Sequence, residues 1–250
     1  MHRYLLALLL IGMSAQTSAS DFSSVKVSLE KALAAEVRTD KERARDQNRK
    51  PIDTLEFFEL REDSIVVELL PGSGWYTKLL APVLREKGEL HIAIGAERIG
   101  RHLAQFDGFD KVSVIAKDAS LSRAEGGKFY DLNLNNLGVR NADIVFTFRN
   151  YHNFSSAGRK VLNEASFQAL RSGGIYAVVD HTRRHMQEGN NENGRRLDPV
   201  LAIKEIQAAG FEFVDFSALH YRPDDELRYE VGRHSVRGNT DRWTLKFRKP

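Results

Sequence analysis

The stretch from Ile65 to Thr77 reads IVVELLPGSGWYT and decides the fold that we expect. Its first six residues are apolar except for Glu68, which is typical of a strand that is buried on both faces. Gly72 and Gly74 then allow a tight turn and let a ligand approach the backbone closely. A predicted helix follows, and the free N–H groups at its start can accept an anion. The stretch therefore predicts a first β-α unit with a binding loop between its strand and its helix.

Apolar runs alternate with helix-like runs through the rest of the chain, and this alternation predicts repeated β-α-β units in a mostly parallel sheet. The predicted strands are 65–70, 90–94, 112–116, 143–148, 175–180, 211–216 and 243–247. The predicted helices between them are 76–87, 99–106, 158–170 and 199–209. Ligands of such sheets bind beyond the carboxyl ends of the strands, so the loops that follow these strands are the candidate sites.

Composition describes an ordinary globular chain and excludes several kinds of chemistry. Of 250 residues, 42% are hydrophobic and 28% are charged, which suits a folded domain rather than a disordered chain. The absence of cysteine excludes disulfides, thiolate zinc sites and cysteine nucleophiles. The formal charge of +3 is too small to indicate nucleic-acid binding. The Lys- and Arg-rich run 41–50 also contains acids, and we interpret it as a solvated helix face.

The N-terminus has the three-part pattern of a secretory signal peptide over residues 1–20. A short basic start precedes the apolar run 4–13 (YLLALLLIGM) and a small, uncharged segment. The run is too short for a stable membrane span, so we expect an exported, periplasmic protein with no membrane span after removal of the signal. An uncleaved N-terminal anchor is the alternative. We expect a helical N-terminal extension over 21–60 and the main domain over 61–250.

The Gly-rich stretch resembles the first motif of class I S-adenosylmethionine-dependent methyltransferases, and the sequence LRSGG at 170–174 resembles a turn of the same family before its fifth strand. A set of bacterial exported predicted methyltransferases is similar over more motifs. They are RKP (49–51), PGSGWYT (71–77), LAP (80–82), FRNYHN (148–153), DH (180–181), RLDP (196–199), AGF (209–211) and the tail TDRWTLKFRKP (240–250). The resemblance implies a three-layer, Rossmann-like, seven-stranded sheet with an antiparallel last strand at 243–247.

The resemblance also implies S-adenosylmethionine as the cofactor. The residues that it assigns to cofactor binding are Glu68, Gly72, Ser73, Gly74, Glu97 and Asp118. Two positions depart from the family pattern. Leu70 stands where the family loop has its first glycine, and Gly95 follows a strand that usually ends before Asp or Glu. Glu97, two residues later, is the acid that would take over the contact with the ribose hydroxyls.

The sequence FRNYHN ends the fourth predicted strand, where class I methyltransferases place residues that face the acceptor. His152 is a candidate to take a proton near neutral pH, and Asn150 is a candidate to hydrogen-bond the acceptor. Asp180, at the end of the fifth predicted strand, is the third catalytic candidate. His152 and Asn150 each have a structural alternative, since a His side chain, for example, often caps a loop.

The candidates for substrate binding are Trp75, Tyr76, Arg149, His181 and Arg196. The two aromatic residues can flank a sulfonium or a flat substrate, or they can pack the start of the helix. Arg149 can bind an acidic substrate through two hydrogen bonds, or it can pair with a carboxylate of the protein itself.

The polar stretch after the fifth strand is either a solvated basic loop or an anion pocket built from Arg183, Arg195 and Arg196. His181 and His185 have a spacing that would suit a metal on a helix, but the two arginines between them argue against one. We therefore expect no metal site. An acidic small molecule is favoured as the ligand of this region.

The leading hypothesis is an exported methyltransferase that acts on a small-molecule acceptor, with no nucleic-acid partner and an oligomeric state that the sequence leaves open. Because S-adenosylmethionine is made in the cytoplasm, a rival hypothesis is a non-enzymatic periplasmic ligand-binding protein that retains the fold. A nicotinamide-dependent oxidoreductase is less favoured. The loop has G-x-G at 72–74 but lacks the third glycine of the dinucleotide fingerprint.

Overall fold

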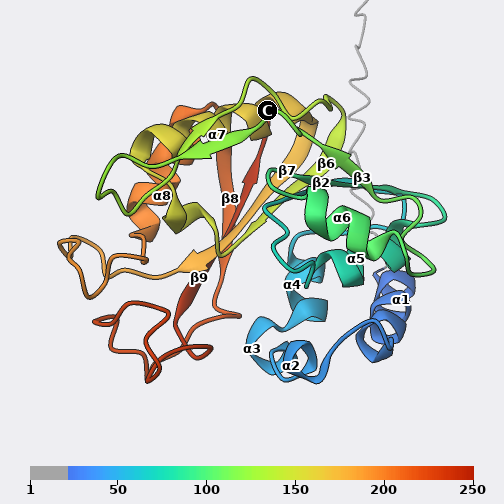
Figure 1. The fold of residues 1–250 in the computed structure, drawn as a ribbon, viewed down its shortest axis with the longest axis horizontal. Coiled ribbons are helices and arrows are strands. Elements are labelled where there is room, and N and C mark those ends of the chain that lie inside the picture. Colours follow the sequence, from blue (N-terminus) through green and yellow to red (C-terminus); the bar gives the residue numbers. More distant parts are fainter. Residues whose placement is uncertain (1–21) are drawn as a thin grey trace, which may run out of the picture.

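The computed structural model describes residues 22–250, so the predicted signal peptide lies outside the described residues. A seven-stranded sheet runs through the molecule in the order β3-β2-β1-β6-β7-β9-β8 (Figure 1). Its strands are β1 (Ile65–Leu69), β2 (Glu89–Ala93), β3 (Ser113–Ile115), β6 (Ala142–Phe148), β7 (Leu170–His181), β8 (Glu212–Ser217) and β9 (Arg242–Arg248). Strand β9 is antiparallel to both of its neighbours, and the remaining pairs are parallel. The predicted seven-stranded, mostly parallel sheet with an antiparallel last strand is confirmed.

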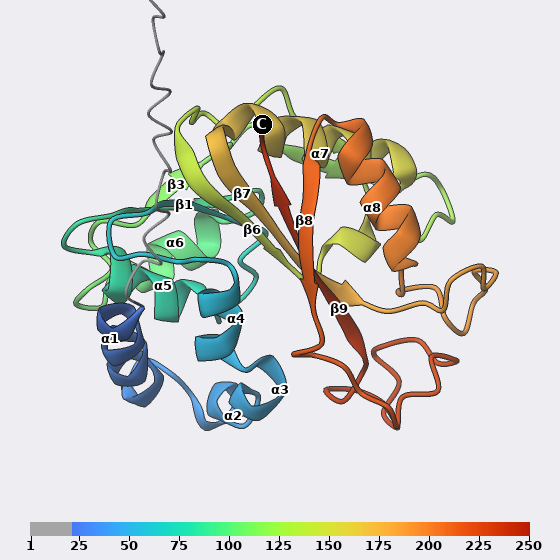
Figure 2. The ribbon, with the colours of Figure 1, turned by 180° about the vertical axis from the view of Figure 1, so that it is seen from behind.

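Helices cover both faces of the sheet and make the three expected layers (Figures 1 and 2). They are α5 (Thr77–Leu84), α6 (Glu97–Leu103), α7 (Ser156–Ala169) and α8 (Pro199–Ala208). Successive residues of a strand face opposite layers, so Val66 and Phe146 pack with α5, whereas Val67 and Val145 pack with α7. This double burial explains why the central strands are nearly continuous apolar runs.

The N-terminal extension is built from four helices, and the first and the last of them pack against the same core as α5. They are α1 (Ser23–Ala34), α2 (Asp40–Arg43), α3 (Asp46–Arg49) and α4 (Pro51–Phe57). Leu29 and Phe58 are fully buried in the cluster that also holds residues of α5 and β1. Thr39 caps α2, because its hydroxyl accepts from Glu42 N while the Glu42 side chain accepts from Thr39 N. The extension is thereby held beside the loop that follows β1.

A small antiparallel hairpin, β4 (Ser120–Ser122) with β5 (Asp131–Asn133), lies outside the main sheet and has no counterpart among the predicted strands. All of its residues except Leu132 are exposed, so it lacks the apolar pattern that reveals a strand in a sequence. Within residues 22–250, no helix combines the length and the apolar character needed to cross a membrane.

The Gly-rich loop lies close against α6, and this contact explains one of its glycines. Gly74 has a φ of 76°, and a Cβ placed there would lie 3.0 Å from Ile99 Cγ1. Gly72 has a φ of 60°, but a Cβ there would meet nothing within 4 Å. The two glycines therefore have different roles. Gly74 allows the loop to pack against α6, and Gly72 leaves open space beside the loop.

Candidate functional site

Four parallel strands end in a residue with a left-handed backbone, and none of these residues is glycine. They are Leu70 after β1, Ile94 after β2, Ala116 after β3 and Arg149 after β6, with φ between 50° and 65°. Each such residue costs roughly 1–2 kcal/mol relative to a right-handed conformation. Strained backbone that gathers at one edge of a sheet is typical of a functional site. The carboxyl edge of the sheet is thus where the site is expected.

A cavity of about 190 Å³ lies at this edge, between the Gly-rich loop and the end of β6. Residues that the sequence predicted for cofactor, acceptor and substrate line it together. They are Glu68, Gly72, Ser73, Trp75, Tyr76, Arg149 and Asn150, joined by Arg45, Arg49, Leu69, Leu70, Pro71 and Phe148. Asn150 Nδ2 donates to Leu70 O at 3.1 Å and so joins the end of β6 to the Gly-rich loop.

Glu68 is a buried acid in the wall of this cavity. Thr77 Oγ1 donates to Glu68 Oε2 at 2.6 Å. Burial raises the pKa of Glu68 to about 7, although the Thr77 hydrogen bond and the positive charge of Arg49 act in the opposite direction. The protein therefore favours the protonated form of this carboxyl group more than water does.

The aromatic residues of the loop are largely buried and support an arginine. Tyr76 stacks on Phe148 with 3.6 Å between ring centroids, and Trp75 Nε1 donates to Glu42 O at 3.0 Å. The Arg49 guanidinium lies 4.3 Å from the centre of the Trp75 ring. Both rings line the cavity, yet most of their surface serves packing and a cation–π contact with the protein's own Arg49.

Four arginines converge on the carboxyl edge of the sheet, and acids lie near them without forming a direct ion pair among the described residues. Within the part of the chain that the structure describes, none of Arg45, Arg49, Arg149 and Arg242 has a carboxylate oxygen within 4.0 Å. The Nε atoms of Arg49 and Arg242 are buried and have no hydrogen-bond partner among the described residues. Burial, together with the neighbouring guanidinium groups, lowers the pKa of Arg49 to about 9 and that of Arg242 to about 10.

Two of these arginines come from the charged run 41–50, so our interpretation of that run as a solvated helix face is wrong for them. Arg49 is 9% exposed, because α3 turns it inward onto Trp75. Arg242, at the start of β9, was not among the predicted site residues, although the tail motif 240–250 contains it. The RKP motif contains Arg49 and was the one signal in the sequence that pointed to it.

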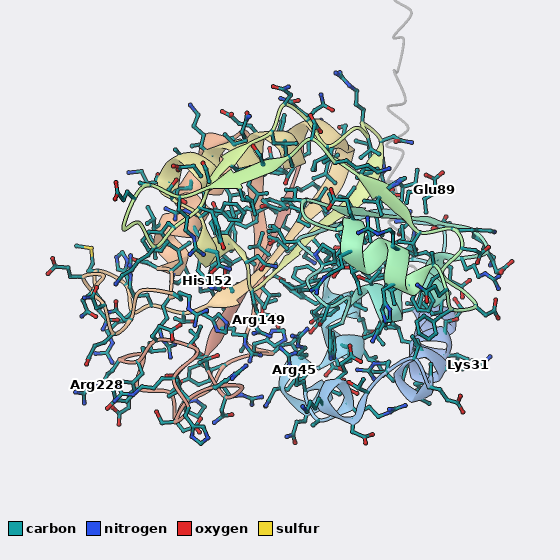
Figure 3. The ribbon with its side chains drawn as sticks, viewed as in Figure 1. Lys31, Arg45, Glu89, Arg149, His152 and Arg228 are labelled. Carbon is teal, nitrogen blue, oxygen red and sulfur yellow. The ribbon has the colours of Figure 1, made fainter. Side chains whose placement is uncertain are left out.

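His152, Asp180 and His181 form a buried hydrogen-bonded group next to Arg149 (Figure 3 labels His152 and Arg149). His152 Nδ1 lies 2.5 Å from Asp180 Oδ1, and the backbone N–H groups of His152 and His181 both donate to the Asp180 carboxylate at 2.7 Å. Asp180 thus joins the ends of β6 and β7. Neither His152 nor Asp180 lines the 190 Å³ cavity, so the geometry favours a positioning role over the direct catalytic role that we predicted.

The ligand atoms of the same three residues lie within 4.8 Å of one another, a spacing that a metal ion would accept. Arg149 Nε, however, donates to His181 Nε2 at 3.3 Å, and Thr240 Oγ1 lies 2.9 Å from His181 Nδ1. Burial and the nearby positive charges also hold the pKa of His181 well below its usual value. The Arg149 guanidinium already faces His181 Nε2, the atom that would bind the metal. The three residues are therefore better described as a hydrogen-bond network. His185 is not part of it, since its Nδ1 lies 2.9 Å from Asp198 Oδ2.

Two larger cavities adjoin the first one and share residues with it. A cavity of about 570 Å³ lies on the other side of Gly72 and Ser73, and its other lining residues are Thr39, Lys41, Glu42, Arg45, Lys78, Arg98, Ile99 and His102. A cavity of about 660 Å³ is lined by Arg149, Arg45 and seven other residues. Volumes of this order suit small-molecule ligands. Glu97, in the first turn of α6, and the exposed Asp118 line none of the three cavities.

The prediction that Arg196 binds substrate is not supported, because its guanidinium is fully occupied inside the protein. Arg196 forms two hydrogen bonds to Asp225, at 2.8 and 2.9 Å, and a third to Tyr229 O at 2.7 Å. Both members of the pair are almost fully buried. Arg195 pairs with Glu230 at the surface. The anion pocket that we considered from Arg183, Arg195 and Arg196 therefore lacks its central residue.

The comparisons with known proteins agree with this fold. No family model and no curated protein matches the chain. A solved methyltransferase from Aquifex aeolicus that depends on S-adenosylmethionine is similar at 15% identity, with a TM-score of 0.57 over 91% of this chain and 97% of that one. The Burkholderia thailandensis 1,6-didemethyltoxoflavin-N1-methyltransferase, solved with S-adenosylhomocysteine, is similar at 13% identity, with a TM-score of 0.56 over 98% and 93%. The cyclase SpnF is similar at 16% identity, with a TM-score of 0.56 over 81% of each chain. The chain therefore has the methyltransferase fold, and at these identities the likeness shows the fold alone.

Glu68→Gln should change how stability depends on pH. Because the pKa of Glu68 is raised from 4.5 to about 7, folding favours its protonated form, and this contribution is lost as the pH rises from about 4.5 through 7. Relative to the wild type, the free energy of unfolding of the variant should therefore rise by up to roughly 3 kcal/mol between pH 4 and pH 8. Urea unfolding at several pH values measures the difference, with the exposed Glu125→Gln as control. A difference that is the same at all pH values would contradict the assignment.

Arg196→Met should destabilise the fold by about 3–5 kcal/mol, because it leaves the Asp225 carboxylate buried without a partner. Arg195→Met removes a more exposed pair and should cost less than about 1 kcal/mol. Denaturant unfolding of both variants gives the comparison. Equal losses would mean that Arg196 is not the structural residue described above.

Proposed function

We propose that the chain is an exported S-adenosylmethionine-dependent methyltransferase that acts on a small-molecule acceptor. The observation that carries the proposal is that side chains of opposite charge line one cavity beside the Gly-rich loop. Arg49 and Glu68 line one small cavity together with Gly72 and Ser73. The methionine end of the cofactor carries one carboxylate and one ammonium group, so it needs a cation and an acid at short range.

The residues present fit this end of the cofactor. Arg49 Nε is buried without a hydrogen-bond partner among residues 22–250, and a carboxylate beside the guanidinium would offset the cost of that burial. Glu68 offers an acid whose ionised form an ammonium group would stabilise. Gly72 leaves open space where a side chain would stand, and the 570 Å³ cavity begins on the far side of that glycine. The roles of Glu97 and Asp118 rest on the sequence resemblance alone.

When bound, the cofactor would supply a methyl group on a sulfonium, and the work of the protein would be to hold an acceptor in line with it. Asn150 holds the Gly-rich loop against the end of β6, through Leu70 O. Asp180 holds the end of β6 against the end of β7, through three hydrogen bonds to His152 and His181. These contacts fix the two loops between which the reactants would lie.

A non-enzymatic ligand-binding protein is the second candidate, and Leu70 is the observation that favours it. Leu70 keeps a φ of 50°, which glycine adopts without strain, yet it carries a large side chain at the wall of the small cavity. That side chain also packs against the core cluster around Val67 and Ile94. Export away from the cytoplasmic supply of the cofactor favours the same candidate.

Isothermal titration of the full chain with S-adenosylhomocysteine separates the two candidates. We expect saturable binding that Arg49→Gln weakens by about ten-fold or more, the loss of one charged hydrogen bond. The variant removes a like charge from the cluster, so it should not lower the free energy of unfolding by more than about 1 kcal/mol. Arg140→Gln is the matched control, since Arg140 is exposed and lines none of the three cavities. No heat at millimolar ligand would favour the binding protein.

Export is tested separately from binding. The protein recovered from the exported fraction of its host should begin within a residue of position 20 or 21, as the small residues Ala19 and Ser20 predict. Intact-mass measurement of that fraction gives the answer. A mass that includes residues 1–20 would favour the uncleaved N-terminal anchor, and recovery in the cytoplasm alone would contradict the proposal of export.

A further inference from the structure

The 660 Å³ cavity is lined by an excess of positive charge. Five arginines line it, together with His181 and three residues without charge, and no acid is among them. The lining residues are Arg45, Arg149, His181, Arg195, Val231, Gly232, Arg237, Gly238 and Arg242. Of the five arginines, Arg195 alone is paired with a carboxylate within the described part of the chain, through Glu230. The cavity therefore carries several uncompensated guanidinium groups.

Gathering these groups costs free energy in the empty protein. Arg242 is 5% exposed, and its buried Nε has no partner among the described residues. Its other two nitrogens donate to the carbonyl oxygens of Asn48 and Gly238, neither of which carries a charge. Burial lowers the pKa of Arg242 and that of Arg149, and further guanidinium groups lower both values. An anion that enters the cavity would relieve this repulsion and satisfy the unpaired donors.

The cofactor alone does not account for the number of cations. Its single carboxylate can accept from about two guanidinium groups, and Arg49 and Arg45 already line the small cavity. Arg237 and Arg242 line the larger cavity and neither of the other two. Arg149 lines both the small and the larger cavity and lies between them. The larger cavity thus has cations of its own, next to the place where a methyl acceptor would lie.

We propose that the 660 Å³ cavity binds a small polyanion, a molecule with two or more carboxylate or phosphate groups, and that this polyanion is the methyl acceptor. The first part stands on the cavity, and the second part rests on the proposed function. The planar fork of arginine matches both oxyanions through paired hydrogen bonds. The volume admits a small molecule and is too small for a folded macromolecular partner.

The residues that line the cavity also suit an anionic oxygen as the atom that accepts the methyl group. Its lone pair forms the new bond to the methyl carbon, while the carbon–sulfur bond breaks and its electron pair stays on sulfur. An ionised oxygen has no proton to lose, so the transfer needs no general base. His181 is the one neutral titratable residue of the lining, and its Nε2 already accepts from Arg149. The absence of a free base from the lining is then consistent with the chemistry.

Titration of the full chain with inorganic phosphate and with citrate, at constant ionic strength set with chloride, tests the polyanion site. We expect saturable binding of at least one of them, by calorimetry and by a rise in unfolding temperature. Binding of phosphate alone would assign phosphate groups to the natural ligand, and binding of citrate alone would assign carboxylates. Arg237→Gln should weaken binding by about ten-fold, whereas Arg140→Gln should leave it unchanged. Both side chains are exposed, so both variants should fold.

Three results would overturn the proposal. The first is that neither probe binds more tightly than chloride. The second is that Arg237→Gln binds the probes as the wild type does, and the third is that Arg140→Gln weakens binding as much as Arg237→Gln. Arg45→Gln provides a second variant at the border of the cavities. S-adenosylhomocysteine affinity, measured on the same samples, should be unchanged in Arg237→Gln. Cofactor binding without anion binding would overturn this inference alone, and anion binding without cofactor binding would overturn the methyltransferase and leave the polyanion site.

Discussion

Repulsion among Arg45, Arg49, Arg149 and Arg242 is the constraint on which the organisation of the site depends. Like charges at short range in a partly buried place oppose folding unless other contacts hold them there. They come from three packed elements: Arg45 and Arg49 from the two ends of α3, Arg149 from the strained end of β6 and Arg242 from the start of β9. The apolar core on both faces of the sheet holds these elements in place. Its stabilisation offsets the repulsion among the arginines, and a bound anion would reduce that repulsion.

The N-terminal extension completes the site. Glu42 joins α2 to α5, because its carboxylate accepts from Lys78 Nζ at 3.0 Å, and Glu42 O accepts from Trp75 at the Gly-rich loop. Arg49 then lies over Trp75, and Arg45 lines all three cavities. Two of the four converging cations therefore come from helices outside the β-α-β repeat. The function that we propose depends on the extension as much as on the Gly-rich loop.

Sequence patterns predicted the sheet well and the site in part. Buried parallel strands are apolar runs that a sequence displays, and the rule for their carboxyl ends correctly brought Asn150, Arg149 and Glu68 to one cavity. The arginine cluster was not predicted, because its members are brought together only by the tertiary structure. The run 41–50 looks balanced in charge, and nothing local reveals that Arg242 faces it. The prediction that Arg196 binds substrate is not supported because Arg196 already pairs with a buried acid of the protein. That acid, Asp225, is distant in the sequence, so the sequence did not reveal the pair. The exposed hairpin of β4 and β5 left no apolar pattern to find.

A crystal structure of the full chain grown with S-adenosylhomocysteine and citrate tests the central claim most directly. We expect the amino-acid end of the first ligand against Gly72 and Ser73, with its carboxylate on Arg49, and citrate on Arg149, Arg237 and Arg242. That result would place both ligands on the guanidinium groups that the protein leaves unpaired. Ligands bound elsewhere, with these arginines turned toward carboxylates of the protein itself, would contradict the account.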